Sequence, residues 1–97
     1  MHEPVLKEEV LRYLDPKPGY TVLDATVGGG GHSEALLEKI LPGGMLMGFD
    51  QDSAALDRTR TRLERFGGSV RLIETNFRYL DQVLSKYPTL KFDSILL

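Results

Sequence analysis

Cysteine is missing from the 97-residue chain, which excludes disulfide bonds and metal sites built on thiolates. Long apolar runs are missing as well: none approaches the ~18 residues that a membrane-spanning helix needs. The start of the chain, Met1–Pro4, lacks the basic and then apolar regions of a secretory signal peptide. These absences are compatible with a protein of a reducing compartment, and they predict no membrane segment.

An excess of basic residues is also missing. Lysine and arginine number 12 against 14 aspartate and glutamate residues, so the formal net charge is −2. A stand-alone RNA-binding module usually carries a basic excess. If the protein binds RNA, we therefore expect most of the phosphate-binding surface to lie outside these residues. The remaining composition, 41% hydrophobic and 27% charged, is that of an ordinary globular chain with room for one domain at most.

Hydrophobic periodicity predicts helices and strands in alternation. In chain order we expect a helix over 4–14, a strand over 20–24, a helix over 33–41, a strand over 45–49 that ends in Asp50, a helix over 53–66, a strand over 70–75, a helix over 79–87 and the start of a strand over 92–97. This alternation predicts an α/β domain, a parallel sheet with right-handed crossovers and flanking helices. The chain stops on Ile95–Leu97, in what we expect to be a buried central strand. Residues 1–97 are therefore interpreted as the N-terminal part of a single domain, truncated after the fourth strand.

Four consecutive glycines, Gly28–Gly31, lie between the first strand and the helix that follows it. Glycine has no side chain, so a ligand can approach the backbone closely at such a loop. A flexible turn is the alternative interpretation. In a parallel sheet, however, ligands bind beyond the carboxyl ends of the strands, at the switch point beside the first strand. The position of the glycines therefore favours a ligand-binding loop.

Two further features follow the second and third strands. Asp50 ends the second strand, 20 residues after Gly30. A carboxylate at about that distance can accept both hydroxyl hydrogens of a ribose, although a turn or helix-cap role is the alternative. Asn76 and Phe77 follow the third strand, where the aromatic ring would lie either against an adenine or in the core. Both pairs of alternatives stay open at this point.

The glycine spacing bears on the kind of nucleotide. The dinucleotide fingerprint G-x-G-x-x-G is matched at Gly28 and Gly30, but Ser33 stands at its third position. No lysine follows the glycines, as a phosphate-binding P-loop would require. S-adenosylmethionine has no phosphate, and its glycine loop holds a methionine tail and a ribose, so the sequence fits this ligand better. His32 would donate to the carboxylate of that cofactor or hydrogen-bond locally at the helix start, and no metal site is expected.

Five motifs occur in one order along the chain. They are His2-x-Pro4-Val5-Leu6, Asp24-x-Thr26-x-Gly28-x-Gly30-Gly31-His32-Ser33, Gly48-x-Asp50-x-Asp52, Asn76-Phe77 and Phe92-Asp93-Ser94-Ile95-Leu96-Leu97. Together they resemble the ribosomal RNA small-subunit methyltransferase H family. The Gly-Gly-His-Ser run is specific, because ordinary methyltransferases carry a plainer D/E-x-G-x-G loop. The resemblance covers essentially the whole chain.

The resemblance implies a Rossmann-like fold that binds S-adenosylmethionine. It also implies methylation of the N4 amine of a cytidine in 16S ribosomal RNA, with the small ribosomal subunit as partner, in the cytoplasm. The residues that it places against the cofactor are Gly30, Gly31, His32, Asp50 and Phe77, with Asp24 as a further candidate. Family members carry Asp-Leu-Gly directly after the fourth strand, beyond the end of this chain. We therefore assign no catalytic residue and expect the 97-residue chain to be inactive alone.

Two other functions stay open from the sequence. One is half of an NAD-dependent dehydrogenase, and Ser33 at the third glycine position argues against it. The other is a nucleotide-binding fragment without catalysis, for which the early end of the chain is the support. The sequence predicts neither the target nucleotide, the RNA-binding surface nor the oligomeric state.

Overall fold

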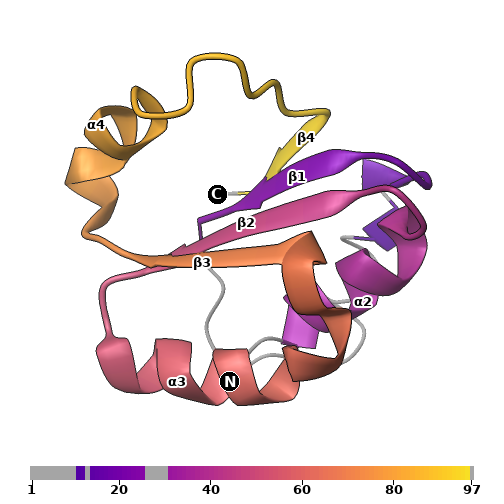
Figure 1. The fold of residues 1–97 in the computed structure, drawn as a ribbon, viewed down its shortest axis with the longest axis horizontal. Helices are drawn as coiled ribbons and strands as arrows, with labels where there is room; N and C mark the ends of the chain where they lie inside the picture. Colours follow the sequence, from indigo (N-terminus) through magenta and orange to yellow (C-terminus); the bar gives the residue numbers. More distant parts are fainter. Residues whose placement is uncertain (1–10, 13, 26–30, 97) are drawn as a thin grey trace.

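The computed structural model describes residues 11–12, 14–25 and 31–96, and these contain a sheet of four strands in the order β3-β2-β1-β4 (Figure 1). The strands are β1 (Thr21–Asp24), β2 (Met45–Asp50), β3 (Val70–Glu74) and β4 (Ser94–Leu96). β1 pairs in parallel with both β2 and β4, and β2 pairs in parallel with β3. The predicted parallel α/β sheet is therefore confirmed.

Helical segments connect the strands on both sides of the sheet. They are α2 (Gly31–Ile40), α3 (Ser53–Arg62) and α4 (Leu80–Leu84), with the short 3₁₀ helices η1 (Glu64–Ser69) and η2 (Phe77–Tyr79). α2 and α3 lie on one side of the sheet and α4 on the other (Figure 1). Of the first predicted helix, only residues 11, 12 and 14 belong to the described part, and these are helical.

The core has two parts, one on each face of the sheet. Val22 of β1 and Leu46 of β2 pack with the inner side chains of α2, whereas Leu23 and Met47 pack on the opposite face with residues of α4. Neighbouring residues of a strand point to opposite faces, so Val22 and Leu23 of β1 serve opposite layers, as do Leu46 and Met47 of β2. All four side chains are fully buried. β1 and β2 are therefore covered on both faces.

The helix predicted over residues 53–66 ends earlier than expected. Its start is capped by Asp52, whose side chain accepts a hydrogen bond from the amide of Ala54 at 3.0 Å. The α-helix ends at Arg62, and Leu63 turns into the core with 2% of its surface exposed. The amide of Phe66 then bonds the carbonyl of Leu63, the tighter pattern of a 3₁₀ turn. Apolar spacing persists through such a turn, so periodicity alone did not locate the end of the α-helix.

The helix predicted over residues 79–87 is regular only in α4. Beyond it, the amide of Lys86 bonds the carbonyl of Val83, and the amide of Tyr87 bonds the carbonyl of Leu84. These bonds span three residues, so the chain continues in tighter turns. Pro88 supplies the physical reason, because a proline disfavours α-helical geometry at the residue before it.

The fourth strand differs from the prediction of a buried central strand. β4 covers Ser94–Leu96 rather than 92–97, and Leu97 lies outside the described residues. Ile95 is 53% exposed, and β4 pairs only with β1 in the described part of the sheet. Asp93 fastens the start of this strand: its Oδ2 accepts from the amide of Thr21 at 2.7 Å, and its own amide donates to the carbonyl of Thr21 at 2.8 Å.

Candidate functional site

The carboxyl ends of β1, β2 and β3 meet at one edge of the sheet. Asp24 pairs with Gly48, and β2 continues past this pair to Asp50, which pairs with Glu74 of β3. In folds of this kind, ligands bind beyond this edge. The topology therefore brings Asp24, Asp50 and the segment that follows β3 to the edge where the sequence predicted a ligand site.

Asp24 is fully buried at the end of β1 and holds the start of α2. The hydroxyl of Ser33, also fully buried, donates to Oδ2 of Asp24 at 3.0 Å. In dinucleotide-binding folds the third glycine of the fingerprint allows close packing of helix on strand. Here a small serine occupies that position and adds a hydrogen bond. The sequence signal for this role was the small size of Ser33, which we interpreted only as a departure from the dinucleotide pattern.

Gly31 and His32 lie in the first turn of α2, because the helix predicted to begin at Ser33 begins at Gly31. Among the described residues, a Cβ atom on Gly31 would meet nothing closer than Nη1 of Arg62 at 3.8 Å, and the φ angle of Gly31 is not positive. A Cβ on Gly44, by contrast, would overlap the carbonyl oxygens of Ile40 and Tyr20. The described structure thus requires a glycine at 44 but not at 31. The described neighbours of Gly31 leave room for a Cβ atom, and Gly30 lies outside the described residues.

Asp50 is half-buried and has capacity left for a ligand. Its Oδ1 accepts from the amide of Asp52 at 2.9 Å, which fixes the carboxylate at the start of α3. Within the described part of the chain, no donor reaches its Oδ2. A carboxylate oxygen of this kind can accept a hydroxyl hydrogen. The turn role and the ribose role that the sequence left open are therefore compatible in one side chain.

Asn76 joins the segments that follow β2 and β3. Its Nδ2 donates to Oε1 of Gln51 at 2.9 Å, and its Oδ1 accepts from the amide of Arg78 at 3.0 Å. The amide of Thr75 also donates to the carbonyl of Asp50 at 2.9 Å. Asn76 therefore fixes the residue after Asp50 relative to η2, whose first residue is Phe77. The side chain of Phe77 lies outside the described part of the structure, and the role of Asn76 was missed in the sequence.

Charged side chains fasten the first turn of α2 to α3. Arg62 Nε lies 3.1 Å from Oε1 of Glu34, and Arg65 Nη2 lies 3.5 Å from Oε2 of the same carboxylate. The hydrogen bond from Arg62 lowers the pKa of Glu34 below its ordinary value, and Arg65 adds to the effect. The carboxylate of Glu34 is thus favoured in its ionised form, which is the form that binds both arginines.

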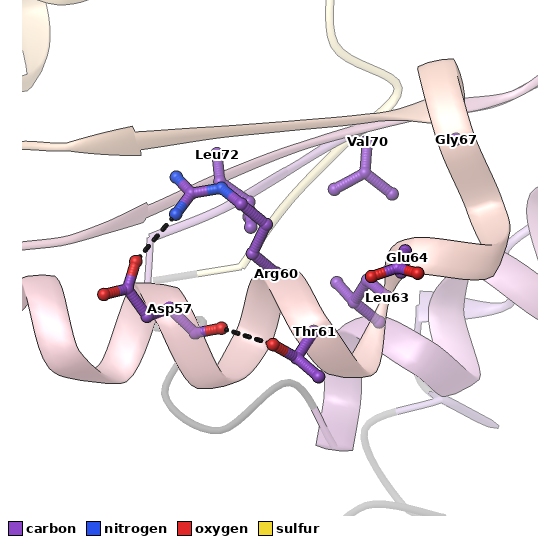
Figure 2. A pocket seen from close by; sticks show the side chains of 8 residues that line it. All are labelled: Asp57, Arg60, Thr61, Leu63, Glu64, Gly67, Val70 and Leu72. Carbon is purple, nitrogen blue, oxygen red and sulfur yellow. Dashed lines mark hydrogen bonds and ion pairs between the residues drawn. The ribbon is translucent and has the colours of Figure 1, made fainter.

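A hollow of about 550 Å³ lies between α3, η1 and the start of β3 (Figure 2). Its lining includes Asp57, Arg60, Leu63, Glu64 and Val70. None of its lining residues comes from the ends of β1 or β2, so it is separate from the predicted ligand edge. Its surface was not foreseen from the sequence.

The described residues contain no group of three or more histidine, cysteine, aspartate or glutamate side chains arranged to hold a metal ion. No helix among them is long and apolar enough to cross a membrane.

Sequence comparison connects the chain with methyltransferases. A family model described as the MraW methylase family matches residues 1–97. The ribosomal RNA small subunit methyltransferase H of Heliobacterium mobile is 50% identical over 97 residues, which are 99% of this chain and 31% of that protein. The protein of the same name from Geobacter sulfurreducens is 45% identical over 96 residues, again 99% of this chain and 31% of that protein. These names confirm the resemblance inferred from the motifs, and the chain spans about 31% of the length of these relatives.

Solved structures of similar fold include several methyltransferases. Protein-L-isoaspartate O-methyltransferase matches with a TM-score of 0.79 at 15% identity, over 99% of this chain and 29% of that one. TrmN from Thermus thermophilus matches with a TM-score of 0.70 at 29% identity, over 81% of this chain and 24% of that one. A putative rRNA-methylase from Clostridium thermocellum matches with a TM-score of 0.70 at 26% identity, over 84% and 46%. The predicted Rossmann-like fold is therefore confirmed.

Proposed function

Because the chain belongs to the MraW methylase family, we propose that it forms the cofactor-binding part of an S-adenosylmethionine-dependent enzyme that methylates the N4 amine of a cytidine in 16S ribosomal RNA. The observation that carries the proposal is the convergence at the edge of the sheet. Gly31, with room beside it, lies at the start of the helix that follows β1. Asp50, with one oxygen not committed to a described donor, ends the adjacent parallel strand β2. The relatives named as ribosomal RNA methyltransferases support the substrate class.

The residues at this edge fit the parts of S-adenosylmethionine. The first turn of α2, with Gly31 and His32, would receive the methionine part, because α2 presents backbone amides at its start. Asp50 would accept the ribose hydroxyls, and the segment fixed by Asn76 would flank the adenine. When bound, the cofactor supplies an electrophilic methyl group. Gly30 and Phe77 remain proposed contacts as well.

The charge of the chain indicates where RNA would not bind. With a formal net charge of −2, these residues lack the excess of positive charge that holds a polyanion. An enzyme that modifies a base must also take it out of the stack and position its poorly nucleophilic amine. We place the groups for these tasks outside residues 1–97 and propose a cytoplasmic enzyme that acts on the small ribosomal subunit.

Two measurements test the proposed function. Calorimetric titration of the purified full-length protein should detect S-adenosylmethionine and not NAD; binding of NAD alone would support a dehydrogenase instead. Incubation with labelled cofactor and unmodified small subunits should yield N4-methylcytidine, detected by mass spectrometry of digested RNA. A different methylated nucleoside would reject the N4 assignment. The 97-residue chain, made alone and assayed beside the full-length protein, should give no methyl transfer.

A further inference from the structure

Four charged side chains form an ion cluster across the surface between α2 and α3. The cluster consists of Glu34, Glu38, Arg62 and Arg65. Arg62 bonds Glu34 at 3.1 Å, and Arg65 reaches Glu34 at 3.5 Å and Glu38 at 3.1 Å. The two glutamates belong to α2, whereas the arginines end α3 and lie in η1. The ion cluster therefore joins α2 to two consecutive elements, α3 and η1, through pairs of residues 28, 31 and 27 positions apart.

Arg62 has a particular place in the ion cluster. Its Nε bonds Glu34, in the first turn of α2, while its Nη1 lies 3.8 Å from the position of a Cβ on Gly31. One guanidinium therefore both bonds this turn and lies beside the backbone of its glycine. The side chain of Glu34 is 28% exposed, so the pair is partly withdrawn from solvent.

A second ion pair on α3 offers a direct comparison. Arg60 bonds Asp57 at 2.9 Å, three residues away on the same helix, and the two side chains are 59% and 77% exposed (Figure 2). Within the described part of the chain, neither side chain of this pair bonds a residue of another element. Exposed ion pairs of this kind contribute little to the stability of a protein. The difference between the pairs lies in what they connect.

We propose that Arg62 is a positioning residue for cofactor binding, which acts through Glu34 to hold the first turn of α2 where the methionine part of S-adenosylmethionine would lie. The inference rests on the proposed function, and it adds Arg62 and Glu34 to the residues on which affinity depends. Neither side chain needs to touch the cofactor. Loss of the Arg62 bond leaves Glu34 with the longer contact from Arg65, so the turn is held less firmly and binding must order it at a cost in affinity.

Matched variants of the full-length protein test this role. Arg62→Gln should weaken binding of S-adenosylmethionine about fivefold or more, measured by calorimetry. Arg60→Gln, which breaks the pair within α3, should bind within about twofold of the wild type. Both variants are titrated well below their midpoints of thermal unfolding, so that affinity is measured on folded protein. Equal affinity of Arg62→Gln and Arg60→Gln would overturn the proposal.

A double-mutant cycle separates action through Glu34 from an independent effect. If Arg62 acts through Glu34, Glu34→Gln should weaken affinity about as much as Arg62→Gln, and the double variant should lose little more. Arg62→Lys keeps the charge and should recover part of the affinity. Additive losses in the double variant would contradict a shared action.

A measurement without cofactor keeps the inference independent of the proposed function. Hydrogen exchange of the peptide covering residues 31–38 should be faster in Arg62→Gln than in Arg60→Gln, because the start of α2 opens locally more often. If the wild type fails to bind S-adenosylmethionine, the proposed function is wrong, and exchange still decides whether Arg62 holds the turn. Unchanged exchange in this peptide would reject the role of Arg62.

Discussion

Side chains at the carboxyl edge of the sheet differ in how much of their hydrogen-bonding capacity the protein itself uses. Asn76 uses both its donor and its acceptor, and buried Asp24 bonds Ser33. Asp50 uses one oxygen for the amide of Asp52. At the scale of single residues, the structure therefore divides this edge into side chains that build it and one carboxylate with capacity for a ligand.

The role of Asp50 can be tested beside a neighbouring acid. Asp50→Asn keeps an acceptor for the amide of Asp52 but removes the charge that ribose hydroxyls would meet. Because hydrogen bonds to charged groups contribute about 1.5–3 kcal/mol, we expect S-adenosylmethionine to bind roughly tenfold or more weakly, measured by calorimetry. The control Asp52→Asn should leave affinity unchanged, since asparagine caps a helix as well as aspartate. Wild-type affinity in Asp50→Asn would exclude the ribose role.

Gly31 gives a prediction in which stability and binding change in opposite directions. The space beside Gly31 accommodates a methyl group, and alanine restricts the unfolded chain more than glycine does. We therefore expect Gly31→Ala to unfold at the same or a higher temperature while its affinity for S-adenosylmethionine falls. Thermal unfolding and calorimetry on the same sample measure both. A lower unfolding temperature would mean that the glycine serves the fold.

At the scale of elements, the sequence predicted which segments form strands and that these strands pair in parallel, because a strand buried on both faces has a recognisable apolar run. Met45–Asp50 is an apolar run between turns, and burial on both faces needs such a run. The ends of the helices are less clearly indicated by the sequence. Leu63 and Tyr87 keep the apolar spacing after the α-helical bonds have ended, since tighter turns preserve that spacing.

The site was predictable to a similar extent. Asp50 and Gly31 could be placed because their positions follow from the strand ends, which the pattern locates. The contacts of Asn76 and Arg62 were not predictable, because each depends on a partner that only the fold brings near. Gln51 and Asn76 are 25 residues apart, and Arg62 and Glu34 are 28 residues apart. Such contacts leave no periodic signal.

The contact between α2 and α3 should depend on pH. Arg62 lowers the pKa of Glu34 below its ordinary value of 4.5, so the ionised form stabilises the folded state. This stabilisation is fully present above the ordinary pKa and is lost as the pH falls through the lowered pKa of the folded state. Glu34→Gln should therefore unfold at a lower temperature than the wild type at neutral pH, and the difference should vanish in acid.

Thermal unfolding of both proteins across a series of pH values measures this difference. Added salt should also shrink it at neutral pH, because mobile ions screen partly exposed pairs. A difference that stays constant from neutral to acidic pH would mean that the glutamine changes packing rather than charge.

At the scale of the whole molecule, the paired strands of the sheet are separated by unequal lengths of chain. The contact between Thr21 and Asp93, which starts the β1–β4 pairing, joins residues 72 positions apart. The β1–β2 and β2–β3 pairings close loops about a third as long. Closing the longer loop costs about 1 kcal/mol more in chain entropy. The three strands that carry the proposed cofactor contacts are thus the ones joined by short connections.

The unequal loop lengths predict an order of folding. During refolding we expect β1, β2 and β3 to assemble first and β4 to dock afterwards, so the cofactor edge would exist before the sheet is complete. Pulsed hydrogen exchange can follow three reporter amides: Met45 for β1–β2, Thr75 for the segment between β2 and β3, and Asp93 for β1–β4. Protection of Asp93 before the other two would reverse the order. On this pathway, the chain completes its proposed cofactor-binding edge before β4 has docked on β1.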